Sequence, residues 1–280
     1  MLRTMITATN TMGQLQHKLD TISNNIANSN TLGFKTQEAT FNELLYQQFN
    51  NDKQDRADRQ SPVGIRYGSG AMLGQIQSNH KQGSLQTTNR DLDLAFTKPK
   101  QYFNILMPDG ENGTKTVYTR QGDFYLSPLN NGTTVMVVNA DGYPLADSTG
   151  QAITLPGNVK SIAVRNGGVL EATDSNGDVI RTDLAVTEFQ KPQLMEHISG
   201  SYVALPNNLA QLGYTQAEVV TELQGANRQQ IGMQSGSLEM SNVNLSKEMT
   251  DLIQTQRSYQ FNARAVTLAD QMLGLINGIR

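Results

Sequence analysis

Side chains that could act as acids, bases or metal ligands are dispersed along the chain. The three histidines, His17, His80 and His197, lie in different segments. General acid–base catalysis needs such a group within hydrogen-bond reach of a second one, and the histidine spacing indicates no such pair. We expect His17 to face solvent. The sequence therefore predicts neither an enzyme nor a bound metal or cofactor.

Two stretches are similar to ligand-binding loops but lack residues that those loops require. Residues 174–178 (DSNGD) begin like a calcium-binding loop, yet Val179 takes the place of its glycine and Ala185 that of its last glutamate. Residues 68–70 (GSG) lack the third glycine of a dinucleotide-binding loop. A hairpin turn explains the first stretch better than a cation site does.

The composition argues against several other classes of protein. A chain of 280 residues can form about two domains. Its net charge of −3 gives no reason to expect a nucleic acid partner. Its mean hydropathy of −0.45, without any long apolar run, argues against membrane insertion. The chain has no cysteine. Its first residues have no apolar run, so we expect no cleavable signal peptide.

The elements that must position any functional residues are two heptad-patterned helices at the ends of the chain. From Leu245 onward two rows of residues alternate at the spacing of a coiled-coil seam, and no glycine or proline interrupts them before Leu273. Asn242 or Asn244 can cap the start of this helix. The first row is Leu245, Leu252, Tyr259, Val266 and Leu273, and the second is Met249, Gln256, Ala263, Asp270 and Asn277.

The N-terminal helix carries a matching pattern and is expected to end near residue 28. We predict that the two helices pair as an antiparallel coiled coil and that their seam residues form an assembly surface. The N-terminal seam is Met5, Ala8, Met12, Leu15, Leu19, Ile22 and Ile26. A further apolar row on the C-terminal helix would stay exposed in this pair: Phe261, Ala265, Leu268, Met272, Leu275 and Ile279.

The middle of the chain changes to a period of two, which is typical of β-strands. Its alternating apolar residues are separated by turn dipeptides such as Asn166-Gly167 and Asn176-Gly177. Residues 41–46 favour a short helix or a strand, and the polar run 50–60 favours an exposed loop. This pattern predicts an antiparallel sandwich or barrel-like domain.

The predicted fold class is α+β, with the terminal helices paired and an all-β domain between them. The predicted domains are a terminal helical coiled-coil domain (1–35 and 237–280), an extended connecting region (36–84 and 206–236) and an antiparallel β domain (85–205).

Several segments are similar to the signatures of one protein family. Central motifs include 92–95 (LDLA), 118–120 (YTR) and 140–145 (ADGYPL). The N-terminal motif is Asn24, Asn25, Ala27, Asn28, Asn30, Thr31, Gly33, Phe34 and Lys35. The C-terminal motif begins at the segment 236–240 and includes Ser241, Asn242, Val243, Asn244, Gln256 and Arg257. Together these motifs resemble bacterial flagellar rod and hook proteins over nearly the whole chain, most closely the distal-rod member or a paralogue of it.

Three positions depart from the pattern of that family. Asn89 stands where the family favours glycine, and Lys98 and Gln101 replace two glycines, with Pro99 between them. We expect the turn into the next strand to differ from the turn that the family has there.

The resemblance implies a structural subunit of the flagellar rod, in the basal body outside the cytoplasmic membrane. Family members are exported through the flagellar type III apparatus with an uncleaved N-terminus. They polymerise into a hollow shaft that transmits torque from motor to hook, with the terminal helices inside and the β domain outside. The expected partners are further copies of the chain, which build a helical homopolymer, other rod and hook proteins, and the export apparatus.

Three other functions stay open on the sequence alone. They are a hook-type axial subunit, a closed coiled-coil scaffold that displays a β domain, and a cell-wall glycan hydrolase. The hydrolase is disfavoured because no pair of acidic residues stands out in the β region. A filament differs from a closed oligomer in its interface symmetry, since heterologous contacts that do not close build helices.

Overall fold

The computed structural model describes residues 2–43, 47–49, 65–67, 71–110, 113–129 and 132–278. The chain divides into two compact units, each assembled from segments that are distant in sequence. It mixes helix and strand and has a β-rich central region, which confirms that part of the predicted fold class. Unit 1 comprises Met1–Ala27, Gln37–Gln77 and Asn244–Arg280, and unit 2 comprises Asn28–Thr36 and Ser78–Val243.

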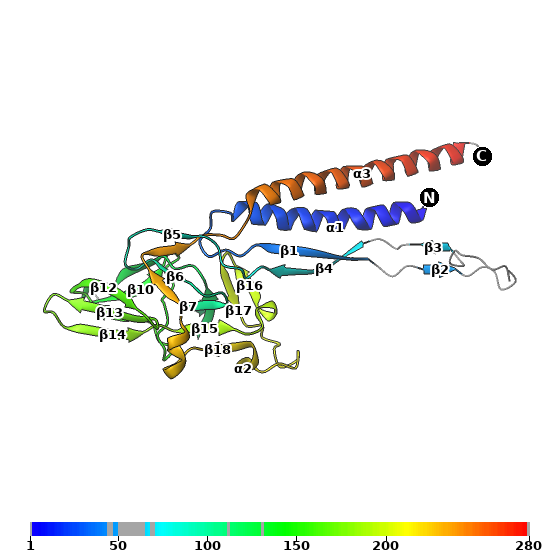
Figure 1. Cartoon of the computed structure of the whole chain (residues 1–280). Coiled ribbons are helices and arrows are strands. Elements are labelled where there is room, and N and C mark those ends of the chain that lie inside the picture. The colour runs from blue at the N-terminus through cyan, green and yellow to red at the C-terminus, as the bar shows by residue number, and fades with distance from the viewer. Residues whose placement is uncertain are drawn as a thin grey trace. The chain divides into compact units, whose positions relative to one another are not determined.

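Unit 1 is built on two long helices, α1 (Leu2–Ala27) and α3 (Leu245–Gly278). The helices contact each other, and Figure 1 shows the N-terminus of α1 and the C-terminus of α3 at the same end, so they run antiparallel. At 1.5 Å per residue α3 is roughly 50 Å long. Asn244 is the residue that caps α3, because its Oδ1 accepts a hydrogen bond from the backbone N–H of Lys247 at 3.2 Å.

Short strands complete unit 1. Residues 41–43 belong to a strand, whereas residues 44–46 and the polar run 50–60, predicted to be an exposed loop, lie outside the described residues. Lys18 of α1 places its Nζ 5.6 Å from the centre of the Phe41 ring. The strands are β1 (Gln37–Glu43), paired with β4 (Ala71–Ser78), and β2 (Gln47–Phe49), paired antiparallel with β3 (Ile65–Tyr67).

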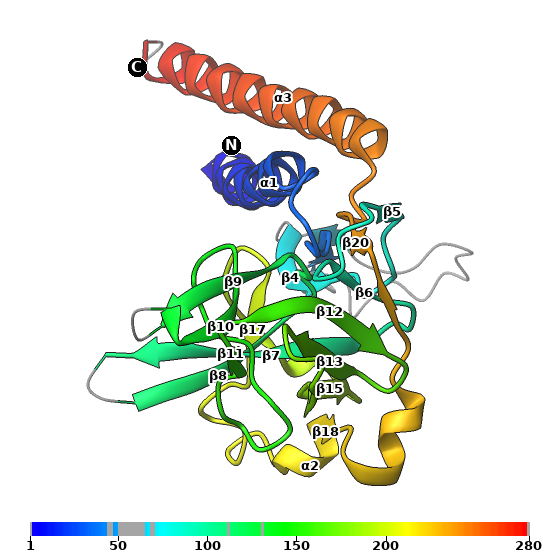
Figure 2. The ribbon, with the colours of Figure 1, turned by 90° about the vertical axis from the view of Figure 1, so that its left-hand side faces the viewer.

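The largest sheet of unit 2 has six strands in the order β16-β17-β8-β7-β15-β18, and its neighbouring strands run antiparallel. Figure 2 labels β17, β8, β7, β15 and β18 of this sheet. Side chains of the central β7 and β8 strands point alternately to the two faces of the sheet. Phe103, Ile105 and Val117 of these strands belong to the core. The strands are β7 (Gln101–Asp109), β8 (Gly113–Thr119), β15 (Val186–Phe189), β16 (Glu196–Ser199), β17 (Tyr202–Ala204) and β18 (Val220–Glu222).

Unit 2 also has two three-stranded sheets, and the predicted hairpins at Asn166-Gly167 and Asn176-Gly177 connect the strands of the second one. Gly167 and Gly177 have φ of +81° and +92°, so the Asn-Gly dipeptides supply the left-handed residues that tight hairpins need. One sheet is β9 (Phe124–Leu129), β10 (Thr134–Asn139) and β11 (Thr154–Pro156), and the other is β12 (Val159–Arg165), β13 (Val169–Asp174) and β14 (Val179–Asp183).

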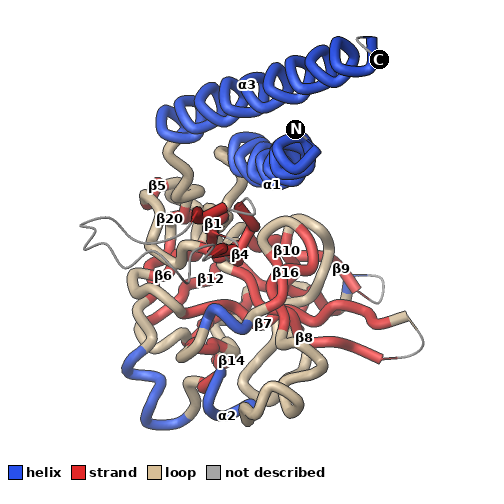
Figure 3. Tube along the Cα trace, turned by 90° about the vertical axis from the view of Figure 1, so that its right-hand side faces the viewer, coloured by secondary structure: helices blue, strands red, loops and turns tan. Residues whose placement is uncertain are grey.

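Unit 2 also contains short strand pairs and single helical turns. Figure 3 shows that strands and loops make up most of it. The pairs are β5 (Leu85–Thr87) with β20 (Ser237–Glu239) and β6 (Leu94–Phe96) with β19 (Met233–Ser235). The turns are α2 (Gln216–Val219) and the 3-10 helices η2 (Pro192–Leu194) and η3 (Gly225–Gln230).

An aromatic cluster lies at the centre of the core of unit 2. The ring of Phe103 packs against Phe96 at a centroid distance of 4.3 Å and edge-on against Phe124 at 5.1 Å. All three side chains are fully buried. They come from β6, β7 and β9, so this cluster joins three of the sheets through apolar contact.

The structure draws one boundary differently from the sequence. Residues 206–236, predicted to be an extended connection, contribute β18 to the six-stranded sheet and β19 to the pairing with β6. These strands, VTE and MQS, are only three residues long, which is too short for an apolar alternation to be recognised. Val220 is buried in one apolar cluster of unit 2, and Met233 packs against another.

The departures from the family pattern fall at special backbone positions. Asn89 has φ of +57°, in the left-handed region that asparagine tolerates better than most residues. In the turn before β7 the left-handed residue is Lys100, with φ of +66°. Asparagine at position 89 thus keeps a glycine-like conformation there.

Candidate assembly site

Asn25 joins three segments of unit 1. Its Oδ1 accepts a hydrogen bond from the backbone N–H of Gln37 at 2.9 Å, and its Nδ2 donates to the carbonyl of Gln37 at 2.9 Å and to Oε2 of Glu248 at 3.2 Å. Asn25 is 1% exposed and Glu248 5%. The amide therefore fixes the direction in which the chain leaves α1 and ties that point to the first turn of α3.

The predicted N-terminal seam residues lie on the covered side of α1. Ala8 and Ile22 are buried, and the others are half-buried: Met5, Met12, Leu15, Leu19 and Ile26. On α3, Leu252, Tyr259, Val266 and Leu273 are half-buried as well, whereas Leu245 is exposed.

The second predicted row of α3 is less covered within unit 1 than the first. Within unit 1 Met249, Gln256, Asp270 and Asn277 are exposed, and Ala263 is half-buried. The inward row lies one residue earlier in each heptad: Glu248, Thr255, Asn262 and Ala269.

Polar residues can occupy this inward row because their hydrogen bonds are satisfied locally. Thr255 Oγ1 donates to the carbonyl of Asp251 at 2.6 Å, and Asn262 Nδ2 donates to that of Ser258 at 2.9 Å. Each bond returns to the preceding turn of the same helix, so the side chain packs without an unsatisfied polar group. A search for apolar residues alone misses such positions.

The outward side of α3 carries an unusual number of large apolar side chains. Phe261 is 75% exposed and Leu275 69%. At about 100° per residue, Phe261, Leu268, Met272 and Leu275 fall within roughly 60° of one another, away from the inward row. Leu245, Met249 and Ile253 form a second exposed group nearer the start of the helix. Contiguous exposed apolar surface of this kind marks an interaction site.

A buried carboxylate in unit 2 binds two cations. Oε1 of Glu239 lies 2.6 Å from Lys35 Nζ, and Oε2 lies 2.6 Å from a terminal nitrogen of Arg120 and 2.7 Å from its Nε. Arg120 and Glu239 have side chains that are 0% exposed. The three residues come from the N-terminal, central and C-terminal family motifs, so this cluster joins segments that are far apart in sequence.

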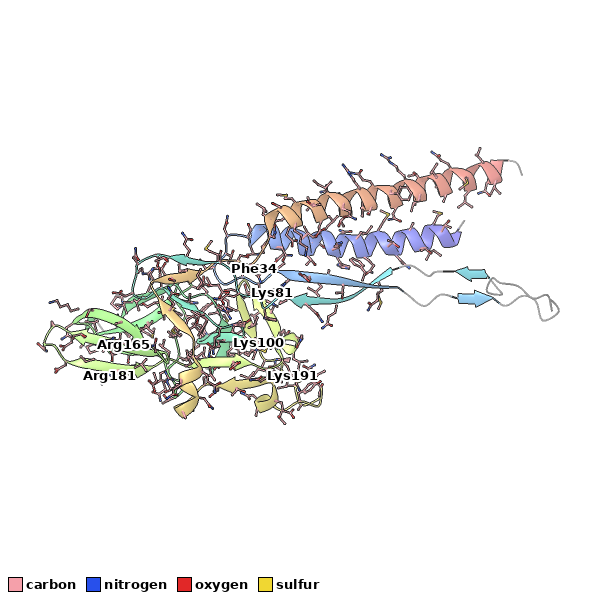
Figure 4. All side chains as sticks on the ribbon, viewed as in Figure 1. Phe34, Lys81, Lys100, Arg165, Arg181 and Lys191 are labelled. Atoms are coloured by element: carbon pink, nitrogen blue, oxygen red, sulfur yellow. The ribbon has the colours of Figure 1, made fainter. Side chains whose placement is uncertain are left out.

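Backbone groups complete the coordination of this cluster. The N–H of Gly83 donates to Oε1 of Glu239 at 2.9 Å. Lys35 Nζ donates to the carbonyl of Lys81 at 2.8 Å, and Arg120 donates to that of Gln101 at 3.1 Å. Figure 4 labels Lys81, whose carbonyl accepts the bond from Lys35, and Phe34, which precedes Lys35 in the chain. Buried charges persist only when they are paired and hydrogen-bonded in this way.

The cluster has one more positive than negative group. Burial, and secondarily the Arg120 guanidinium, lower the pKa of Lys35 to about 8, although Glu239 acts in the opposite direction. Lys35 can therefore lose its proton in mildly alkaline solution and leave the Arg120–Glu239 pair neutral.

Two further motif residues fix the backbone around the cluster. Gly33 has φ of +67°, and a Cβ there would lie 2.6 Å from the backbone carbon of Arg120. Asn242 accepts hydrogen bonds at Oδ1 from the N–H and the hydroxyl of Thr36, both at 2.8 Å. Its Nδ2 donates to the carbonyl of Asn79 at 2.7 Å. Gly33 and Asn242 therefore fix the backbone of residues 33–36 next to the C-terminal segment that contains Asn242.

The remaining motif residues lie in different surroundings. Asn28 Oδ1 accepts a hydrogen bond from Thr31 Oγ1 at 3.1 Å, in the turn after α1. Phe34 and Ser241 are buried and Val243 is half-buried. The exposed ones are Asn24, Ala27, Asn30, Asn244, Gln256 and Arg257.

Lys35 was predicted as a motif residue, but the other charged residues in these contacts were not predicted as site residues. In β20 Glu239 is buried while the neighbouring Leu238 is only half-buried, so hydropathy alone assigns the inward position to the wrong residue. Arg120 and Glu248 are likewise charged residues that pattern rules place in solvent. For Arg120 and Glu239 the available signal was their presence inside the family motifs.

The histidines form no catalytic set in the described structure. Ser78 Oγ lies 2.6 Å from His197 Nε2, and His80 Nδ1 lies 2.8 Å from Tyr102 Oη. Among the described residues no group of three or more His, Asp or Glu side chains could hold a metal ion. None of the helices in those ranges is long and apolar enough to cross a membrane.

Comparison with known families identifies the class of protein. The model described as "flagellar basal body rod FlgEFG protein C-terminal" matches residues 234–279, and that of the "flagellar hook protein FlgE/F/G D1 domain" matches residues 99–172. The "flagella basal body rod protein" model matches residues 5–35. The chain belongs to the flagellar rod and hook protein family, which confirms the resemblance found in its motifs.

Particular relatives match over nearly their whole length. The flagellar hook-basal body complex protein FlhP of Bacillus subtilis is 43% identical over 100% of both chains. The flagellar basal-body rod protein FlgG of the same organism is 31% identical over 98% of this chain and 97% of its own. FlgG of Caulobacter vibrioides is 33% identical over 100% of both.

Proposed function

We propose that the chain is a structural subunit of the flagellar rod and polymerises through its terminal helices. Family membership supports the location in the basal body and the role of an axial protein. The observation that carries the assembly step is the exposed apolar row of α3, formed by Phe261, Leu268, Met272 and Leu275. Exposure of these apolar side chains to water is unfavourable. The free energy falls when a neighbouring subunit covers them.

The helix pair is the framework of this proposal. We infer that α1 and α3 form an antiparallel coiled coil with an inward row of Glu248, Thr255, Asn262 and Ala269. Thr255, Asn262 and Ala269 are small or bonded to their own helix, and Glu248 bonds to Asn25 of α1, so this row buries little apolar area. The pair therefore depends on further contacts, and neighbouring subunits supply them at the outward apolar rows and at the predicted seam residues that stay exposed, such as Met249 and Gln256.

Polymerisation follows from the kind of contact. A heterologous contact, between the outward row of one copy and a different surface of the next, builds a helical array when its rotation does not close. The partners are then further copies of this chain and the other axial proteins that adjoin the two ends of the polymer. A shaft built in this way transmits torque, and its subunits pass through the flagellar export apparatus with an uncleaved N-terminus.

A charge placed in the outward row tests this function. Leu268→Lys should leave both units folded but prevent incorporation into basal bodies and abolish swimming, because an unpaired buried ammonium costs several kcal/mol. Thr267→Lys is the matched control, since it adds the same charge at an exposed position of the same helix that lies about 80° or more around the helix from the row. Normal incorporation of the Leu268 variant would contradict the proposal.

A hook-type subunit is the second candidate, because the matched D1 model is described as that of a hook protein. Fractionation separates the two. A rod subunit stays with basal bodies from which hooks have been removed, whereas a hook subunit leaves with the hook.

A further inference from the structure

Two buried aspartates of unit 2 face each other across a strand bridge. Asp93 and Asp123 are antiparallel bridge partners. The hydrogen bonds beside them run from Leu94 N–H to the Gly122 carbonyl at 2.9 Å and from Phe124 N–H to the Leu92 carbonyl at 3.3 Å. The aspartates are thus a non-hydrogen-bonded pair, the kind whose side chains approach most closely. Like charges in that position repel each other.

The charges around this pair do not balance. Asp93 is 3% exposed and Asp123 7%, and Oδ1 of each is buried without a hydrogen-bond partner in the described structure. One cation approaches: a guanidinium nitrogen of Arg90 lies 3.2 Å from Asp93 Oδ1. If both aspartates are ionised, Asp93, Asp123 and Arg90 together carry one excess negative charge, and the two carboxylates are shielded from water.

The other elements packed around the pair supply no second cation among the described residues. Gln121 hydrogen-bonds to Asp123 and is neutral. On β17 Tyr202 interacts electrostatically with Asp123, and its hydroxyl donates to Asp141, which adds a further negative charge. On the side of β20, Gly236 and Ser237 present only backbone N–H groups to the carbonyl of Asp93, and Glu239 is already paired.

We propose that Asp93 and Asp123 bind one proton between them, and that this proton stabilises unit 2 at the junction of its central strands with the returning C-terminal segment. The proton comes from water and forms an O–H on one carboxyl, which donates to the carboxylate of the other. The Oδ1 of Asp123 then has a partner, and Arg90, which already lies 3.2 Å from Asp93 Oδ1, neutralises the charge that remains. This inference is independent of how the protein assembles.

The electrostatics of Asp123 support this arrangement. Burial raises its pKa above the ordinary value of 3.8, and the charge of Asp93 acts in the same direction. An acid whose pKa is raised on folding contributes stability below its unfolded pKa and loses it as pH rises through its folded pKa. The stability of unit 2 should therefore fall as pH rises from about 4 towards neutrality.

Substitution by asparagine imitates the protonated acid and tests the proposal. The full-length Asp123→Asn protein should unfold in urea with little pH dependence between pH 4 and 7, whereas the unsubstituted protein weakens over that range. At pH 7 the unfolding equilibrium constant of the variant should be lower, by about tenfold for each unit by which the pKa is raised. Asp109→Asn, at an exposed carboxyl, should keep the pH dependence of the unsubstituted protein.

An equal pH dependence in the Asp123→Asn and unsubstituted proteins would overturn the proposal. Carboxyl carbon NMR on the unsubstituted protein gives a second reading that does not depend on how the variant folds. The carboxyl signal of Asp123 should titrate above the ordinary range of an aspartate pKa. Two independent titrations near pH 4 would also overturn it.

Discussion

The side chains of Asn25 and Glu248 are hydrogen-bonded, Nδ2 to Oε2 at 3.2 Å, although 223 residues separate them. Both are buried in unit 1. Asn25 lies at the end of α1 and Glu248 in the first turn of α3, so the contact fixes the register in which the two helices meet. A buried carboxylate in this position is tolerated because the amide satisfies it.

Asn25→Ala should destabilise unit 1 by about 2–4 kcal/mol, because the carboxylate of Glu248 and both backbone groups of Gln37 lose their partner. Thermal unfolding followed by helical circular dichroism measures this loss. Ser23→Ala, at an exposed position in the same helix turn, is the control and should change little. If Asn25→Ala unfolded at the same temperature as Ser23→Ala, the contact between Asn25 and Glu248 would not stabilise the pairing of the two helices.

Glu239→Gln should destabilise unit 2 by about 3–5 kcal/mol, since Lys35 and Arg120 would remain buried without a countercharge. Urea unfolding of the full chain gives the value. The surface ion pairs in which Arg165 and Arg181 flank Glu171, at 2.8 and 2.9 Å, offer a matched control (Figure 4). Glu171→Gln should leave stability nearly unchanged because exposed pairs contribute little. Equal losses in the two variants would argue against a special role for the buried cluster.

The lowered pKa of Lys35 makes unit 2 more stable in alkali. A base whose pKa falls on folding, here from 10.5 to about 8, contributes stability above its unfolded pKa and loses it as pH falls through its folded pKa. Stability should therefore rise between pH 8 and 10, by an amount on the order of 3 kcal/mol if Lys35 acts alone. Lys35→Met should abolish this rise. A rise that persists in the variant would assign it to other groups.

Gly33→Ala should destabilise unit 2 by several kcal/mol, because its left-handed backbone strains alanine and the new Cβ would meet the backbone of Arg120. Gly13 in α1 is the matched control, since nothing lies within 4 Å of a Cβ built there. Gly13→Ala should stabilise α1 by about 1 kcal/mol. Denaturation of both variants against the parent chain distinguishes these opposite signs.

Periodicity predicted the elements whose faces differ in polarity. The long helices, the strands of the central region and the hairpins at Gly167 and Gly177 follow directly from spacing and turn chemistry. The inward face of α3 was predicted only in part. Thr255 and Asn262 satisfy their polar groups on their own helix, so they pack inward in place of the neighbouring Gln256 and Ala263 that the heptad spacing had assigned to the seam.

Contacts between distant segments could not be read from the sequence. Nothing in the spacing of Lys35, Arg120 and Glu239 indicates that they meet, because their approach depends on how the strands of unit 2 pair. The motifs nevertheless contain all three. A charged residue within a motif thus indicated a buried contact that hydropathy would have excluded.

The central claim is that the outward row of α3 becomes buried between subunits. The chain has no cysteine, so Leu268→Cys introduces a single thiol whose reaction with a water-soluble maleimide reports exposure. We expect fast labelling in the dilute monomer and strong protection in isolated basal bodies, while Asp109→Cys in unit 2 controls for reagent access. Equally fast labelling of the thiol at position 268 in both states would contradict the account.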